Sequence, residues 1–267
     1  MKRISYLLIG FVFCIANLTS CIEGGNVVEE VDYGVLEYNS KNAAVVLKTA
    51  QGNLYSAQMQ NLYNLLEMNV GECYIILYNL NYDLPENAKN VVEQNGYYTV
   101  TLKDYAKLPQ FYLSSYLTDI TRILPNEVAV SKGFNGGNAF SGYFFMSHTL
   151  SLPEDSEVNW NLSYDVESMM PTIENGKRYY DLYVRAIETK KGDKAKINQE
   201  HFNAYYVDDY LSRAASNERS ILGSDYSQNS SKFSVRIFYA SNIDLESERI
   251  TWQKDEIEIY VASYLKE

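Results

Sequence analysis

The chain has 267 residues, of which 46% are hydrophobic and 21% charged. This composition is close to that of ordinary globular proteins, and it predicts a packed core in one large domain or two of usual size. The 34 acidic residues outnumber the 23 basic ones, which gives a formal net charge of −11. A chain this acidic is repelled by phosphate backbones, so we expect no nucleic-acid partner.

The first twenty residues have the parts of a bacterial export signal. Lys2 and Arg3 form a basic start, and residues 6–16 form an apolar run interrupted only by Gly10. A transmembrane helix needs about 20 apolar residues, so this run is too short to span a membrane. The pattern predicts a cleaved signal peptide over residues 1–20.

A lipid attachment motif follows the apolar run directly. Leu18-Thr19-Ser20-Cys21 matches the lipobox of bacterial lipoprotein precursors. The match implies cleavage between Ser20 and Cys21 and attachment of a diacylglycerol to the Cys21 thiol, with acyl chains such as palmitate as the membrane anchor. We therefore expect a lipid-anchored protein of the cell envelope. Ile22 stands where an aspartate would favour inner-membrane retention, so the outer membrane is the expected location, on its periplasmic face or at the cell surface.

The cysteines and histidines give no sign of a reactive or metal-binding site. Cys14 leaves with the signal and Cys21 takes the lipid, so Cys73 cannot form an internal disulfide in the mature chain. It lies in the apolar run 73–78, which predicts a buried residue and not a nucleophile. His148 and His201 are the only histidines, and their separation is not that of zinc ligands. We expect each to be an ordinary residue of a loop or helix start.

The first half of the mature chain follows the period of β-strands after a tether predicted over residues 21–32. The predicted strands are 33–38, 43–49, 54–57, 73–82 and 96–102. Residues 59–68 are ambiguous, and 83–95 are a loop or short helix. Five short strands with tight early hairpins predict a small OB-like β-barrel over residues 33–125, with an open meander as the alternative.

The second half, residues 126–267, is also rich in strands. A bridge over 103–126, with a short helix at 111–124, is expected to join the two domains. The predicted strands are 127–131, 139–147, 158–164, 178–189, 233–239 and 256–265. Asn198 favours a helix over 199–217, whose buried stripe would contain Phe202, Tyr206, Tyr210 and Ala214. The prediction is a β-sandwich-like domain with one inserted helix, so the fold class is mainly β.

No set of residues in the sequence matches a known catalytic or cofactor-binding pattern. There is no Gly-x-Ser-x-Gly elbow, and the glycine-rich stretch 133–137 lacks the lysine of a phosphate-binding loop. No loop has the order of calcium ligands. We therefore expect no catalytic residue, no cofactor and no metal site. Because 34 acidic residues supply a pair of carboxylates by chance, a polysaccharide hydrolase stays open as an alternative.

Three stretches carry a family resemblance: residues 32–37, the hairpin 48–55 and the run 71–80. Together with the lipobox and the two β-rich halves, they resemble the NigD-like lipoproteins of the Bacteroidota. The resemblance implies paired β domains on a lipid anchor, and it carries over no catalytic residue.

The leading interpretation is a non-enzymatic envelope module that binds a protein or glycan partner. The expected tether, the paired β domains and the 25 tyrosines support it, because tyrosine combines an apolar ring with a polar tip. A fimbrial or adhesin subunit is the second interpretation, and the hydrolase is the third.

Overall fold

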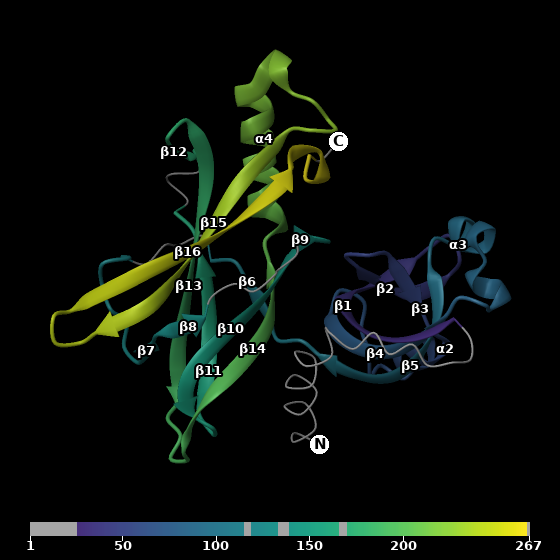
Figure 1. Cartoon of the computed structure of the whole chain (residues 1–267), viewed down its shortest axis with the longest axis horizontal. Helices are drawn as coiled ribbons and strands as arrows, with labels where there is room; N and C mark the ends of the chain where they lie inside the picture. Colours follow the sequence, from purple (N-terminus) through teal and green to yellow (C-terminus); the bar gives the residue numbers. More distant parts are fainter. Residues whose placement is uncertain (1–25, 115–118, 133–138, 166–169, 266–267) are drawn as a thin grey trace. The chain divides into compact units, whose positions relative to one another are not determined.

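The computed structural model describes residues 26–114, 119–132, 139–165 and 170–265. The chain forms two compact units that divide between Gln110 and Phe111. The first is drawn in purple to blue in Figure 1, and the second runs from teal to yellow. The predicted signal peptide, its cleavage site at Ser20 and the predicted lipid site at Cys21 lie outside the described residues. No helix in the described ranges is long and apolar enough to cross a membrane.

The first unit is a closed five-stranded barrel with the strand order β1-β2-β3-β5-β4. Its strands are β1 (Val27–Asn39), β2 (Ala44–Thr49), β3 (Asn53–Tyr55), β4 (Cys73–Asn81) and β5 (Tyr98–Lys107). Its helices are α2 (Ala57–Asn64), η1 (Pro85–Asn87) and α3 (Lys89–Asn95). The barrel closes because β1 pairs antiparallel with both β2 and β4, while β3 runs parallel to β5. This confirms the OB-like barrel over the open meander.

Strand β1 is longer than the sequence pattern indicated. It begins at Val27, inside the stretch expected to be a tether, because residues 27–32 pair with the last part of β4. The side chains at its start are exposed, so the alternation that marks a half-buried strand is missing there. Gly34 lies where a Cβ atom would come within 2.0 Å of the Lys48 carbonyl oxygen, so only glycine allows this close approach of β1 to β2.

The ambiguous segment after β3 contains a short helix. Ser56 caps α2, with its side-chain oxygen accepting a hydrogen bond from the backbone N–H of Gln58 at 3.2 Å. Met59 and Met68 are fully buried in the barrel core, one in α2 and one in the segment that leads to β4. The helix therefore covers part of the barrel's apolar interior.

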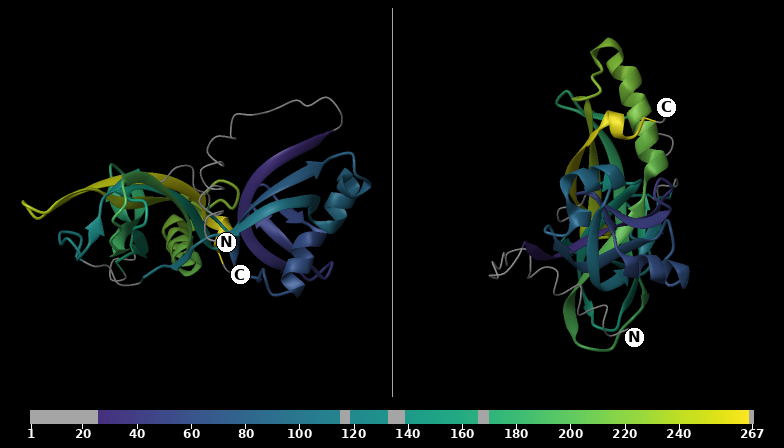
Figure 2. Two further views of the ribbon diagram at one scale, coloured as in Figure 1. Left: turned by 90° about the horizontal axis from the view of Figure 1, so that it is seen from below. Right: turned by 90° about the vertical axis from the view of Figure 1, so that its right-hand side faces the viewer.

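The second unit consists of two sheets that share one core (Figure 2). The first sheet has the order β6-β14-β10-β8, with β9 paired to β10, and the second has the order β11-β13-β15-β16, with β7 and β12 paired to β13. The first contains β6 (Gln110–Tyr112), β8 (Val130–Lys132), β9 (Ala139–Phe140), β10 (Tyr143–Pro153) and β14 (Lys196–Tyr206). The second contains β7 (Glu127–Val128), β11 (Glu157–Ser163), β12 (Thr172–Glu174), β13 (Lys177–Lys190), β15 (Lys232–Asp244) and β16 (Arg249–Tyr260).

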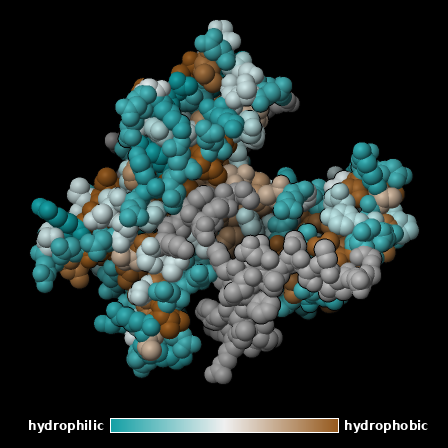
Figure 3. Space-filling model, in the orientation of Figure 1, coloured by the Kyte–Doolittle hydropathy of each residue, from teal (hydrophilic) through white to brown (hydrophobic). Residues whose placement is uncertain are grey.

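One substantial helix, α4 (Asp208–Leu222), lies alongside β15, and two short helical turns, η2 (Gly223–Asp225) and η3 (Val261–Ser263), complete the unit. Buried apolar side chains from both sheets and from α4 form a single cluster. The surface seen in Figure 3 is accordingly mostly hydrophilic, with scattered hydrophobic residues. The mainly β fold class, with a barrel followed by packed sheets and one helix, is confirmed.

The predicted helix over 199–217 is wrong in its first half. Residues 196–206 form β14, which pairs with β10 along its whole length, and the helix begins only at Asp208. Asn198 is a strand residue opposite Ser151 and not a helix cap. The misleading signal was the four-residue spacing of Phe202 and Tyr206, which also places both on one face of a strand.

Two smaller differences concern segment ends. The last strand is β16, which starts at Arg249 and ends at Tyr260, because twelve of its residues pair with β15 before the chain turns into η3. The described parts of 111–124 form β6 and turns instead of a helix. Phe111 packs on Tyr205 with ring centroids 5.5 Å apart, so this segment, expected in the first domain, lies with the second unit.

Candidate functional site

The second sheet has one face in the core and an opposite face that carries aromatic and charged side chains. Along β13, Tyr180, Leu182 and Val184 are buried in the core, as their alternation in the sequence predicted. The residues between them point to the other side, where they lie beside residues of β15 and β16. We call this surface the arginine–aromatic face: Tyr179, Asp181, Tyr183 and Arg185 of β13, Arg236 and Phe238 of β15, and Trp252, Lys254 and Glu256 of β16.

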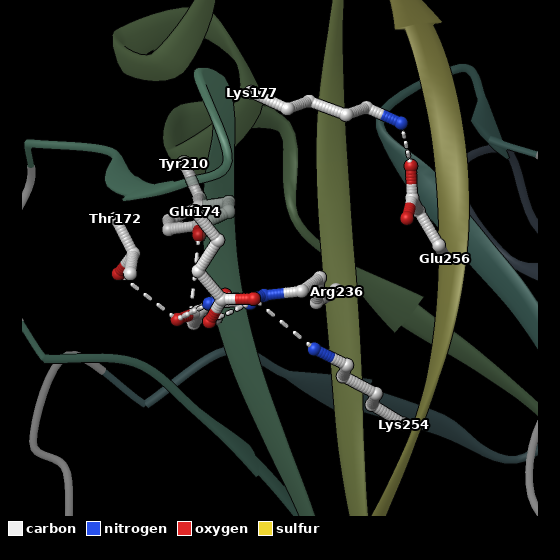
Figure 4. Close-up of polar contacts among 8 residues, drawn as sticks. Thr172, Glu174, Lys177, Tyr210, Arg236, Lys254 and Glu256 are labelled. Atoms are coloured by element: carbon white, nitrogen blue, oxygen red, sulfur yellow. Dashed lines mark hydrogen bonds and ion pairs between the residues drawn. The ribbon is translucent and has the colours of Figure 1, made fainter.

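Arg236 is the centre of this face (Figure 4). Its side chain is only 3% exposed. Asp181 accepts two hydrogen bonds from it, from Nε at 2.6 Å and from Nη2 at 2.7 Å. The remaining nitrogen, Nη1, lies 2.5 Å from Glu174 Oε1, and the other Glu174 oxygen lies 3.5 Å from Lys254 Nζ. Thr172 donates a further hydrogen bond to Asp181 at 3.1 Å. The guanidinium is therefore held by two carboxylates from different strands.

Aromatic rings flank the same guanidinium. Its Cζ atom lies 4.4 Å from the ring centroid of Tyr179 and 5.3 Å from that of Phe238. Phe238 stacks on Tyr183 at 5.0 Å, and Tyr183 meets Trp252 edge-on at 5.5 Å. All four rings are half-buried. The face thus has a continuous row of rings beside fixed cations, an arrangement in which each cation–ring contact is mildly attractive.

The charges of the face are fixed near neutral pH. Hydrogen bonding to Asp181, and then contact with Glu174, raises the pKa of Arg236. The contact with Arg236 lowers the pKa of Glu174. In the same way, the contact between Lys177 and Glu256 raises the pKa of the lysine and lowers that of the glutamate. Glu174 and Glu256 therefore stay ionised as acceptors, and Arg236 and Lys177 stay charged donors.

At the end of the face that carries Arg185 and Trp252, residues 119–122 cover the surface. Arg185 is fully buried and donates hydrogen bonds to the carbonyls of Asp119 and Arg122, each at 3.0 Å, and to Glu127 at 3.2 Å. Trp252 Nε1 donates to the carbonyl of Ile120 at 3.1 Å. Burial lowers the pKa of Arg185 and raises that of Glu127. The Arg236 end is more open, because Glu174 is 48% exposed.

The two histidines come together in the core, contrary to the expectation of loop or helix-start positions. His148 of β10 lies directly opposite His201 of β14, and both point between the sheets. His148 stacks on Trp160 with centroids 4.5 Å apart, and its Nε2 lies 3.1 Å from the Tyr205 hydroxyl. Trp160 also meets His201 edge-on at 5.5 Å. Burial lowers the pKa of His148 to about 3 and that of His201 to about 4.

Other residues marked in the sequence lie apart from the arginine–aromatic face. Cys73 is buried in the barrel, as expected, and burial raises the pKa of its thiol to about 12. Within the described ranges, no three or more side chains of histidine, cysteine, aspartate and glutamate are grouped so as to hold a metal ion.

Comparison with known proteins places the barrel in a family. Residues 24–106 match the family model of the lipoprotein OB domain. The barrel is therefore similar to lipoprotein OB domains. The family name implies association with the cell envelope, and the match agrees with the NigD-like lipoprotein resemblance of the sequence. A search of curated proteins finds no match to the chain.

Solved structures match most of the chain. An uncharacterized protein from Parabacteroides merdae has a TM-score of 0.72 at 20% identity, covering 87% of this chain and 99% of its own. A candidate lipoprotein from Bacteroides fragilis has a TM-score of 0.52 at 13% identity, and the match covers 86% of this chain and 98% of that protein. A NigD-like immunity protein from Bacteroides caccae also matches, with a TM-score of 0.43 at 12% identity, and the match covers 90% of this chain and 99% of that protein. At these identities the first two matches show a shared fold and nothing more.

Replacing Asp181 by asparagine should strongly destabilise the second unit. The buried Arg236 would lose the charge of its bidentate partner, and breaking a buried ion pair from one side costs about 3–5 kcal/mol. Urea unfolding should therefore show a large loss for Asp181→Asn. The matched control is Glu174→Gln, which alters the half-exposed partner of the same guanidinium and should leave stability nearly unchanged. Equal losses in the two variants would contradict this assignment.

The buried histidines should make the fold sensitive to mild acid. In the unfolded chain, histidine titrates near 6.5. The pKa of folded His148 is about 3, so the folded state binds fewer protons and loses stability as pH falls below 6.5. Between pH 7 and pH 5, wild type should lose about 2 kcal/mol more unfolding free energy than His148→Phe, which has no imidazole to protonate there. Urea unfolding at both pH values measures this difference, and parallel losses would contradict it.

Proposed function

We propose that the protein is a lipid-anchored envelope module that binds a glycan through the arginine–aromatic face. The observation that carries the proposal is the row of half-buried rings beside the ionised Arg236–Asp181 pair. A sugar ring offers an apolar C–H face, which packs on aromatic side chains, and hydroxyl groups, which bond to fixed charged groups. Aspartate, glutamate and lysine are depleted from the cores of protein–protein interfaces, whereas arginine and aromatic residues are enriched there. The aspartate, glutamate and lysine side chains around Arg236 therefore favour a glycan over a protein partner.

The anchor belongs to the same proposal. The lipobox at 18–21 and the lipoprotein OB domain that follows support acylation of Cys21 after cleavage of residues 1–20. Five residues then separate the lipid from Val27, where β1 begins. Fully extended, five residues reach at most about 18 Å, so the barrel would stay close to the bilayer. We place the lipid in the outer membrane because Ile22 lacks the charge of an inner-membrane retention signal.

The two alternatives receive less support. A hydrolase needs a carboxyl group of raised pKa facing a second carboxylate across an open site. Among the described residues, burial raises the pKa of Asp32, which lies in barrel strand β1, and of Glu127, which is buried against Arg185. A fimbrial subunit that loses an N-terminal strand would lose β1, and with it the ladders to both β2 and β4 that close the barrel.

Glycan binding should depend on the rings of the face. Phe238→Leu keeps apolar volume but removes the aromatic surface, and it should weaken binding by about ten-fold, which corresponds to about 1.4 kcal/mol. The measurement is calorimetric titration of the full mature chain with oligosaccharides selected from a broad glycan panel. The control is Tyr38→Ala, which removes a 52% exposed ring from the barrel and should bind like wild type. Unchanged affinity in Phe238→Leu, or equal losses in both variants, would count against this face.

Membrane attachment should depend on one cysteine. Cys21→Ser removes the thiol that accepts the diacylglycerol, so the protein should leave the membrane fraction of the expressing bacterium and lose its acyl mass by mass spectrometry. The control is Cys73→Ser, which changes the buried thiol and should keep both membrane attachment and acyl mass. A Cys21→Ser protein that still sediments with membranes and carries lipid would refute the anchor.

A further inference from the structure

We infer that the ligand is an acidic glycan, a uronic-acid polymer, whose carboxylate replaces that of Glu174 beside Arg236. The inference rests on the proposed function and specifies its ligand class. In this structure the Glu174 carboxylate occupies the position that the ligand carboxylate would take.

The two partners of Arg236 differ in how firmly they are held. Asp181 binds it through two short hydrogen bonds, is itself bonded by Thr172, and is 18% exposed. Glu174 contacts only the remaining Nη1 edge and is 48% exposed. Nη1 is buried and makes an ion-pair contact with Glu174 but no hydrogen bond. A carboxylate that accepts a hydrogen bond from Nη1 would satisfy this edge better than Glu174 does.

The segment that carries Glu174 is held by its pairing with β13 and by polar contacts, not by buried apolar side chains. Strand β12 has three residues, Thr172, Ile173 and Glu174, and all are exposed. A tight turn at Asn175 and Gly176, both with positive φ, joins it to β13. No residue of β12 belongs to the buried core. Withdrawing Glu174 would therefore uncover little apolar surface, and half-exposed ion pairs of this kind are weak.

The position of the Glu174 carboxylate suits an external acid group. It lies between Arg236 Nη1 and Lys254 Nζ, so a carboxylate there meets two cations. Lys254 Nζ is 6.0 Å from the ring centroid of Tyr179 and 5.8 Å from that of Phe238. A uronic acid combines a carboxylate with a pyranose ring of about the size of an aromatic side chain. Its carboxylate matches the two cations, and its ring matches the adjacent aromatic surface.

Complementarity of charge favours this ligand over a neutral sugar. Once Glu174 withdraws, Arg236 keeps only the single negative charge of Asp181, and Lys254 loses the partner at 3.5 Å. The local charge then becomes positive within a chain whose overall charge is −11. An acidic polymer approaching this chain would be repelled by most of its surface and attracted at this position.

The test compares oligosaccharides of galacturonic, glucuronic and mannuronic acid with their neutral methyl esters. Each is titrated calorimetrically into the full mature chain. We expect at least one acid to bind about ten-fold more tightly than its ester. Glu174→Gln, which removes the competing charge, should tighten binding of that acid several-fold, and Lys254→Gln should weaken it several-fold. Neither substitution should change binding of the ester.

The matched control is Glu258→Gln, which removes one negative charge from the same strand as Lys254 but from the ion pair with Lys232. It should not change affinity for the acid. Equal tightening by Glu174→Gln and Glu258→Gln would reveal general electrostatic attraction and overturn the inference. Equal binding of acid and ester would also overturn it while leaving glycan binding intact. A negative result with these probes and with the broad glycan panel would overturn the proposed function as well.

Discussion

Strand β13 is the element on which the second unit depends. It pairs with β11 on one side and with β15 on the other, and the short strands β7 and β12 pair with it near its ends. Because side chains alternate along a strand, one half of β13 supplies the core and the other half supplies the arginine–aromatic face. A shift of one residue in the β13–β15 register would exchange the two faces and bury charges in place of apolar side chains.

Arginine ion pairs with at least one buried partner recur along β13 and its neighbour β15. Arg178 pairs with the buried Glu218 of α4, Arg185 pairs with Glu127, and Arg236 pairs with Asp181. Such pairs contribute little net stability relative to apolar packing, but removing one partner is costly, so they restrict which segments can lie together. The glutamate partners of Arg178 and Arg185 are both buried. Arg236 differs because its second carboxylate comes from an exposed hairpin, which leaves one edge of a buried cation accessible to a competitor.

The errors in the sequence-based predictions have a common cause. The spacing of Phe202 and Tyr206 fits one face of a helix and one face of a strand equally well, and the pairing of β14 with β10 decided between them. The same pairing brought His148 and His201 together between the sheets. The apolar neighbours Met146 and Leu150 on the same face of the strand indicate burial of His148, whereas His201 lies between the polar Gln199 and Asn203. Residues 27–32 do not alternate between apolar and polar side chains, so the sequence does not indicate the strand that their pairing with β4 forms.

The sequence by itself determined the features that depend on neighbouring residues. These are the short strands of the barrel and the alternation of Phe233, Val235 and Ile237 that places Arg236 on the opposite face of β15. The pattern of residues 1–21 predicts export and lipidation in the same local way. The tertiary structure alone decided that Asp181, Arg236 and Glu174 meet, because they lie on three strands whose order and register no local pattern encodes. Strand pairing joins distant segments through main-chain groups that every residue shares, so the sequence shows which residues share a face but not which strands lie side by side.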